Sequence, residues 1–206
     1  STNNIQLIQF FKQQCEIENQ KNIIESRIKN WSFILDHKGN ILPPSNIYFP
    51  TPDDENWNDP NSEISFLHAD IQKFLLKNPE TRNWLEKIGV TEKTDLSYLR
   101  KTIIANASVY STLENTLGTI STIFSLYSKN EIGKDELEKL FELKLLTSKG
   151  GLLPARLCYF SDTYNPRLKL QAELPDDIFI SESYLSDNAE KDEWRRFFKL
   201  MGVKDG

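Results

Sequence analysis

Apolar residues recur at helical spacing in the first part of the chain and again near its middle, and these two stripes predict the main helices. Over 5–30 the apolar positions alternate with Gln, Lys and Glu, which predicts one helix. From Asp95 to Ser128 they recur at alternating spacings of three and four, which predicts the longest helix. We expect it to pack inside its own domain rather than form an exposed coiled coil. Its stripe comprises Tyr110, Leu113, Leu117, Ile120, Phe124 and Tyr127.

Short apolar runs between these helices predict a β-hairpin. The runs are 33–35 and 41–42, and Gly39 between them can adopt the positive φ that a tight turn needs. Pro43 and Pro44 end the second run, because proline lacks an amide donor.

An acidic, proline-bounded loop follows over 50–63, and a short helix is predicted after it. Pro79 suits the first position of that helix, and Gly89 suits a left-handed cap at its end. Within the loop, Trp57 is a large apolar residue amid charged ones. We interpret Trp57 as a candidate contact for a partner.

The hairpin region occurs twice in the chain. Residues 34–49 align without a gap with 145–160 at an offset of 111, and seven of the sixteen pairs are identical. A further block aligns at an offset of 113 and pairs 66–67 with 179–180 and 84–90 with 197–203. The repeat signature comprises Gly39, Pro43, Tyr48, Gly89, Gly150, Pro154, Tyr159 and Gly202.

This duplication predicts an α+β fold of two similar helix–β-hairpin–helix modules joined by a long amphipathic helix. We expect the first module over 1–92 and the second, with the long helical spacer, over 93–206. Duplicated packing units usually build surfaces, whereas catalytic sets are seldom repeated in this way. The repeat therefore favours a structural or interaction module over an enzyme.

Composition narrows the class of protein further. A hydrophobic fraction of 38%, a charged fraction of 27% and a net charge of −5 indicate a globular chain and argue against general binding of polyanions. Cys15 and Cys158 lack the spacing of metal ligands, so a reducing, cytoplasmic setting is expected. The N-terminal residues do not resemble a signal peptide, and the weakly charged stretch 106–128 is too rich in Ser, Thr and Asn for a membrane helix. We expect no membrane partner.

Three candidate chemistries have simpler structural explanations. The turn over 148–151 lacks the spacing and the following helix of a phosphate loop. The acidic loop does not have the spacing of a calcium site. His37 and His68 have no neighbouring cysteine, and serine stands at both matching positions of the second copy. We therefore predict no catalytic residue, no cofactor and no metal.

A basic cluster near the end of the chain leaves one alternative open. Arg195, Arg196 and Lys199 are interleaved with aromatic residues, as in surfaces that bind nucleic acid. In a winged-helix-like arrangement, Lys38 and Lys149 would lie at the tips of the hairpins. The alternative function is thus a nucleic-acid-binding module.

The repeated string resembles a recurrent motif of very large sacsin-type proteins and their bacterial relatives. The matching residues are Ile34-Leu35, Gly39, Leu42-Pro43, Tyr48 and Ile88-Gly89-Val90 in the first copy, and Leu145-Leu146, Gly150, Leu153-Pro154, Tyr159, Asp162, Asn165-Pro166 and Leu200-Met201-Gly202-Val203 in the second. Pro44 and the longer acidic loop of the first copy depart from the motif.

The resemblance implies that this chain is a non-catalytic interior segment of a larger, multidomain, ATPase-containing protein. In that family the ATPase is a separate gyrase/chaperone/histidine-kinase-type domain, and its motifs do not occur here. The implied partners are other proteins or other domains of the same polypeptide. For the alternative, the bacterial relatives suggest a defence or restriction-associated protein. The only methionine, Met201, lies near the end of the chain, which also leads us to expect a segment of a longer protein.

Overall fold

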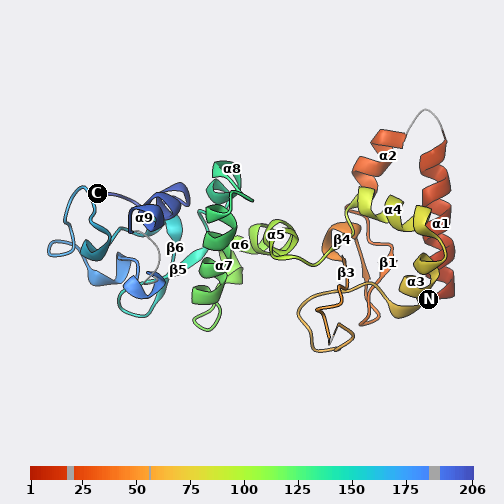
Figure 1. Ribbon diagram of the computed structural model, residues 1–206, viewed down its shortest axis with the longest axis horizontal. Coiled ribbons are helices and arrows are strands. Elements are labelled where there is room, and N and C mark those ends of the chain that lie inside the picture. Colours follow the sequence, from red (N-terminus) through yellow and green to blue (C-terminus); the bar gives the residue numbers. More distant parts are fainter. Residues whose placement is uncertain (18–20, 56, 186–190) are drawn as a thin grey trace. The chain divides into compact units, whose positions relative to one another are not determined.

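The computed structural model describes residues 1–17, 21–55, 57–185 and 191–206 (Figure 1). Helices and short two-stranded sheets make up the described regular structure, so the predicted α+β class is confirmed. The chain divides into two compact units, Ser1–Ser97 and Tyr98–Gly206, which we call unit 1 and unit 2.

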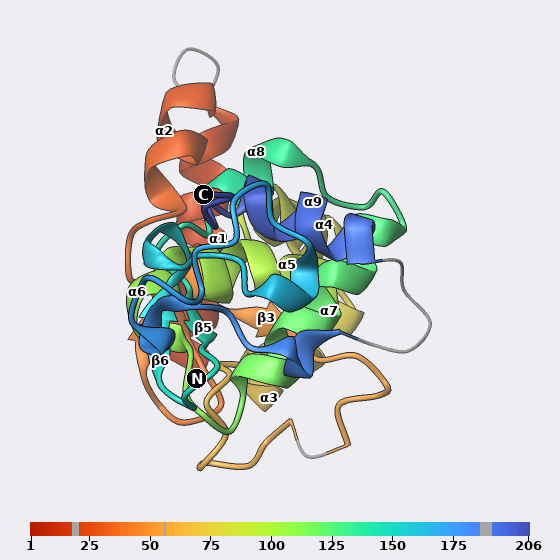
Figure 2. The same ribbon diagram turned by 90° about the vertical axis from the view of Figure 1, so that its left-hand side faces the viewer.

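Unit 1 begins with a helical hairpin of α1 (Thr2–Glu16) and α2 (Lys21–Ile28), seen from two directions in Figures 1 and 2. The single helix predicted over 5–30 is therefore wrong. Helix α1 ends at Glu16, because Ile17 adopts an extended conformation with φ −73° and ψ 119°. Apolar periodicity alone does not reveal such a break, since both helices continue the same pattern.

A β-hairpin follows, formed by β1 (Ile34–Leu35) and β2 (Ile41–Leu42). Asn4 ties α1 to this hairpin: its side-chain amide donates to the carbonyl of Phe33 at 2.7 Å and accepts from the amide of Leu35 at 3.1 Å. Strand β3 (Tyr48–Phe49) then pairs in parallel with β4 (Thr91–Glu92).

Helices α3 (Ala69–Leu76) and α4 (Pro79–Ile88) complete the core of unit 1, and α5 (Asp95–Tyr98) lies at the boundary of the two units. Gly89 ends α4 with φ +118°, a value that favours glycine. The buried core of unit 1 comprises Ile8, Cys15, Ile28, Phe33, Ile34, Ile47, Phe49, Leu67, Ile71, Leu75, Trp84, Leu85, Ile88 and Val90.

Unit 2 begins with a π-helical turn over Leu99–Ile103 and a 3-10 turn over Ile104–Asn106. The helices α6 (Ala107–Tyr110), α7 (Thr116–Ser128) and α8 (Lys134–Glu138) follow. A second hairpin, formed by β5 (Lys144–Leu146) and β6 (Leu152–Pro154), precedes four 3-10 turns. These turns are Ala155–Leu157, Asp162–Tyr164, Asp176–Ile178 and Glu182–Tyr184. Helix α9 (Lys191–Leu200) closes the unit.

The long helix predicted from Asp95 to Ser128 is wrong, because the chain leaves the helical conformation at Ser111 (ψ 133°). Local side-chain bonds explain the interruption. The side-chain oxygen of Asn115 accepts from the backbone amide of Thr112 at 2.8 Å. Its side-chain amide group donates to the carbonyl of Tyr110 at 3.1 Å. Such bonds give the backbone an alternative to the helix. Leu113 lies in this interruption and is 60% exposed rather than packed.

Paired residues of the two copies make the same backbone hydrogen bonds. Leu67 donates to the carbonyl of Tyr48 at 3.0 Å, and Ile180 donates to the carbonyl of Tyr159 at 2.9 Å. Gly39 and Gly150 have φ +89° and +81° in the hairpin turns. Gly202 ends α9 with φ +99°, as Gly89 ends α4. The same local backbone pattern therefore occurs in both units.

Candidate binding pocket

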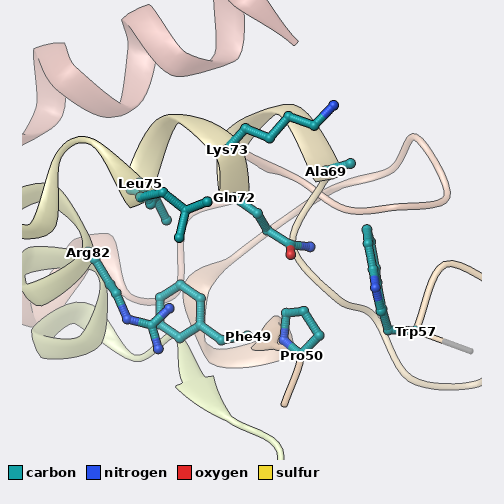
Figure 3. A pocket seen from close by; sticks show the side chains of 9 residues that line it. Phe49, Pro50, Trp57, Ala69, Gln72, Lys73, Leu75 and Arg82 are labelled. Carbon is teal, nitrogen blue, oxygen red and sulfur yellow. The ribbon is translucent and has the colours of Figure 1, made fainter. Parts of the chain in front are cut away.

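Unit 1 contains a pocket of about 330 Å³ between the end of β3, the acidic loop, α3 and α4 (Figure 3). Trp57, the residue predicted to contact a partner, is one of its walls. The other lining residues are Phe49, Pro50, Ala69, Gln72, Lys73, Leu75, Leu76 and Arg82. The volume is at the lower end of the range for pockets that bind small ligands.

The floor of the pocket is the ring of Phe49, which β3 places in the core with 1% of its surface exposed. The guanidinium of Arg82 lies 4.0 Å from the centre of this ring, in a cation–π contact. Arg82 also pairs with Glu86 at 3.3 Å and with Glu92 at 3.2 Å. Its charge is thus largely balanced within unit 1, and its planar group forms one side of the pocket (Figure 3).

Helix α3 forms the wall of the pocket that lies uppermost in Figure 3. Because the helix is amphipathic, some of its residues face the core and others reach the rim. Ile71 and Leu75 face the core, whereas Leu76 is 86% exposed at the rim of the pocket. Gln72 points into the pocket in Figure 3, and its side-chain amide donates to the carbonyl of Leu67. An exposed leucine beside an apolar pocket adds apolar surface that a partner could bury.

A turn in the acidic loop positions Trp57. The carboxylate of Asp54 accepts from the amide of Thr51 at 2.7 Å and from its hydroxyl at 2.9 Å. The amide of Trp57 then donates to the carbonyl of Asp54 at 3.1 Å. In Figure 3 the indole stands at the opposite side of the pocket from Arg82.

The residues predicted for the nucleic-acid alternative are partly neutralised by acidic partners. Arg195 and Lys199 on α9 both bind the carboxylate of Asp205, at 2.7 and 3.3 Å. Lys149 pairs with Asp176 at 3.1 Å. Within the described part of the chain, Lys38 in unit 1 and Arg196 in unit 2 form no ion pair.

Asp205 is held as an anion by these partners. Burial raises the pKa of its carboxyl, but hydrogen bonds from Arg195, the backbone amide of Arg167 and Lys199 outweigh burial and hold the pKa at about 2. The pairing of a helix arginine with this acid was not predicted. The offset of 113 could have indicated it, because it aligns Arg82 with Arg195 and Glu92 with Asp205.

Both histidines have local structural contacts. The ring of His37 accepts from the amide of Phe66 at 3.1 Å and also contacts the carbonyl of Asp59 at 3.0 Å, which joins the hairpin to the acidic loop. His68 accepts from the amide of Asp70 at 3.2 Å and so caps α3. Over residues 1–17, 21–55, 57–185 and 191–206, no group of three or more His, Cys, Asp or Glu residues could hold a metal ion.

Cys158 and Lys101 are among the groups outside the pocket whose pKa values are shifted. Burial raises the pKa of the Cys158 thiol to about 12, which makes the thiolate rare at neutral pH. Burial lowers the pKa of Lys101 to about 7. Among the described helices, none combines the length and the apolar character needed to span a bilayer.

Comparisons with protein-family models, with curated proteins and with solved structures gave no match to this chain. The resemblance to sacsin-type proteins therefore stays a prediction that rests on the repeat signature.

Proposed function

We propose that this chain is a non-catalytic interaction module that binds a protein partner, or another domain of its own polypeptide, through the pocket beside Trp57. The observation that supports this most is the combination of an apolar pocket with an apolar rim. Phe49, Pro50 and Leu75 offer a floor for an apolar side chain, and Leu76 and Trp57 extend the apolar surface outward. Aromatic anchors in such pockets supply much of the affinity of protein interfaces.

The resemblance to sacsin-type proteins is consistent with this function, because it implies an interior segment without an ATPase domain. The location in a larger multidomain protein is part of the proposal. The nucleic-acid alternative receives less support, because three of the five predicted cations already form ion pairs with Asp205 or Asp176. Binding that falls steeply with salt concentration would favour that alternative instead.

A selection from random peptides tests the proposal without knowledge of the natural partner. The full chain is immobilised, peptides displayed on phage are selected, and the dissociation constant of the best synthetic peptide is measured by fluorescence anisotropy. Trp57→Ala removes a wall of the pocket and should weaken binding by about 2 kcal/mol, or roughly 30-fold in Kd. Leu76→Glu should weaken it too, because it places a charge on the apolar rim.

Trp31→Ala is the matched control. Trp31 is an aromatic residue of the same unit that is 50% exposed and does not line the pocket. It should leave Kd unchanged, and Trp57→Ala should leave the melting temperature unchanged. The proposal fails if no peptide is selected, or if the selected peptides bind the Trp57→Ala and Trp31→Ala variants equally well.

A further inference from the structure

In unit 2 a buried tyrosine, Tyr164, packs against Phe160, the counterpart of the pocket residue Phe49 of unit 1. Tyr164 is fully buried. The centre of its ring lies 5.6 Å from that of Phe160 and 6.0 Å from that of Phe198. Its hydroxyl donates to the carbonyl of Ser181 at 2.7 Å. In unit 2, therefore, a tyrosine ring packs beside the phenylalanine that corresponds to Phe49.

Two of the residues that contact Tyr164 have counterparts at the pocket of unit 1 or directly before it, whereas Phe198 corresponds to Leu85, which does not line the pocket. Phe160 corresponds to Phe49, the floor of the pocket, at the offset of 111. Ser181 corresponds at the offset of 113 to His68, the residue before Ala69 in the pocket wall. The two phenylalanines occupy the same place in their backbone frames, because the neighbouring tyrosines make the same strand bonds.

The loop that carries Tyr164 shares one backbone hydrogen bond with the acidic loop of unit 1. The backbone amide of Asn165 donates to the carbonyl of Asp162 at 3.1 Å. At the offset of 111, the backbone amide of Asp54 donates to the carbonyl of Thr51 at 3.0 Å. In this turn the counterpart of Tyr164 is Asp53, which is exposed. Unit 1 therefore has an exposed aspartate at the position where unit 2 has a buried tyrosine.

The positive charge of Lys73 at the rim favours an occupant with a negative charge next to its aromatic ring. Lys73 is exposed at the rim, points outward in Figure 3 and forms no ion pair among the described residues. Its ammonium can meet a carboxylate of a segment that crosses the rim. Arg82, on the far side, is balanced by Glu86 and Glu92, so Lys73 is the cation at the rim that can meet a partner's carboxylate.

We infer that the pocket binds the tyrosine side chain of an extended, acidic segment of a partner protein. This inference rests on the proposed function and names the occupant of its pocket. The ring packs against Phe49 between Arg82 and Trp57, in a tilted arrangement like that of Tyr164 on Phe160, and an acidic residue next to the tyrosine meets Lys73. The tyrosine hydroxyl donates to the carbonyl of His68, as Tyr164 donates to that of Ser181. This carbonyl already accepts from the amide of Gln72 at 3.0 Å and has a second lone pair for the hydroxyl.

The hydrogen bond from the hydroxyl predicts that the pocket prefers tyrosine to phenylalanine and to phosphotyrosine. A phenylalanine fills the same space but donates no hydrogen bond, so it should bind about fivefold more weakly. A phosphotyrosine should not bind, because its phosphate would replace the donor with an anion facing a carbonyl oxygen. The order tyrosine, phenylalanine, phosphotyrosine therefore distinguishes this pocket from one that recognises phosphate.

The experiment uses the full chain with 5-fluorotryptophan in place of its four tryptophans, observed by ¹⁹F NMR. The first probe is p-cresol, the side chain of tyrosine, with toluene as its analogue without the hydroxyl. The second set is four octapeptides with identical Gly and Ser flanks and a central Asp-Tyr, Asp-Phe, Asp-phosphotyrosine or Asp-Leu. Binding should shift the signal of Trp57 in a saturable way and leave that of Trp194, in unit 2, unchanged.

Two variants exchange the aromatic ring between the units. Asp53→Tyr places a tyrosine at the position that Tyr164 has in the other loop, so it should occupy the pocket and abolish binding of p-cresol at Trp57. Asp53→Ser is its control and should bind p-cresol as the native chain does. Tyr164→Ala opens the corresponding space in unit 2, and p-cresol should then shift the signal of Trp194. If Tyr164→Ala does not fold, the Asp53 pair still decides the question.

The outcomes separate this inference from the function on which it rests. If the Asp-Leu peptide binds at Trp57 and the Asp-Tyr peptide does not, the tyrosine inference is wrong and the interaction pocket remains. If Asp53→Tyr binds p-cresol as well as Asp53→Ser, the correspondence with Tyr164 is wrong. If neither p-cresol nor any peptide, including those selected from phage, shifts the Trp57 signal, both proposals are overturned.

Discussion

Replacing Asp205 with asparagine should destabilise unit 2 by an amount that depends on pH. The carboxylate of Asp205 is 8% exposed, and Arg195 approaches it with distances of 2.9 and 2.7 Å to its two oxygens. Lys199 adds a contact at 3.3 Å, and the amide of Arg167 donates at 3.0 Å. These bonds fasten the last residues of the chain to α9 and to the preceding loop. Asp205→Asn keeps the shape and removes the charge.

The magnitude follows from the pKa of Asp205. Its ordinary value of 3.8 falls to about 2 in the folded chain, which corresponds to about 2 kcal/mol at neutral pH. Because the folded-state pKa is the lower one, the stabilisation is fully present above about pH 4 and is lost as the pH falls through 2. Asp205→Asn should therefore lower the free energy of unfolding by about 2 kcal/mol at pH 7, and the difference from the native chain should shrink below pH 4.

Urea unfolding measured by ¹⁹F NMR of fluorotryptophan separates the two units, since Trp194 reports on unit 2 and Trp84 on unit 1. The matched control is Glu92→Gln, which breaks the corresponding ion pair of unit 1. The side chains of Arg82 and Glu92 are 36% and 57% exposed, so this pair should contribute less than about 1 kcal/mol. Equal losses in the two variants, or an Asp205→Asn difference that stays constant from pH 7 to pH 2, would refute the reasoning.

Two other perturbations test the backbone and the buried polar groups of unit 2 by the same unfolding assay. Gly118→Ala should stabilise α7 by about 0.5 to 1 kcal/mol, because a Cβ there meets no atom within 4 Å, whereas Gly202→Ala should cost about 1 kcal/mol or more at φ +99°. A loss in the first variant or a gain in the second would contradict this argument. Tyr184→Phe removes the hydroxyl that accepts from the amide of Leu146 at 2.6 Å, and should cost about 1 to 3 kcal/mol and speed hydrogen exchange at that amide. Unchanged exchange would show that the amide has another partner.

The sequence allowed the local elements to be predicted where one residue type determines the conformation. The hairpin over 33–42 and the end of α4 could be placed because Gly39 and Gly89 adopt conformations that other residues rarely do. The interruption at Ser111 could not be placed in this way. The hydrogen bonds of Asn115 compete there with the helix, and apolar spacing carries no information about that competition.

The pocket could be predicted only in part, because three segments distant in the sequence form it. Trp57 could be predicted as a candidate contact, because it is an apolar residue in an acidic loop. The contact of Arg82 with Phe49 and the exposure of Leu76 depend on how α3 and α4 pack over β3, and no local pattern encodes this. For the basic cluster, the sequence showed the cations but not that Asp205 binds two of them.

The comparison of the two loops indicates where function should be sought in this chain. Residues that recur in both copies, such as Gly39 and Tyr48, form turns and strand bonds, so their recurrence follows from the needs of the backbone. Asp53 and Tyr164 differ although they stand at matching positions, and the backbone bond that recurs there does not depend on either side chain. Unit 2 buries its own aromatic ring, whereas unit 1 exposes an aspartate near the pocket that Trp57 lines. An exposed aspartate in place of a buried ring, beside a pocket with an apolar rim, is a reason to look for a binding role in unit 1.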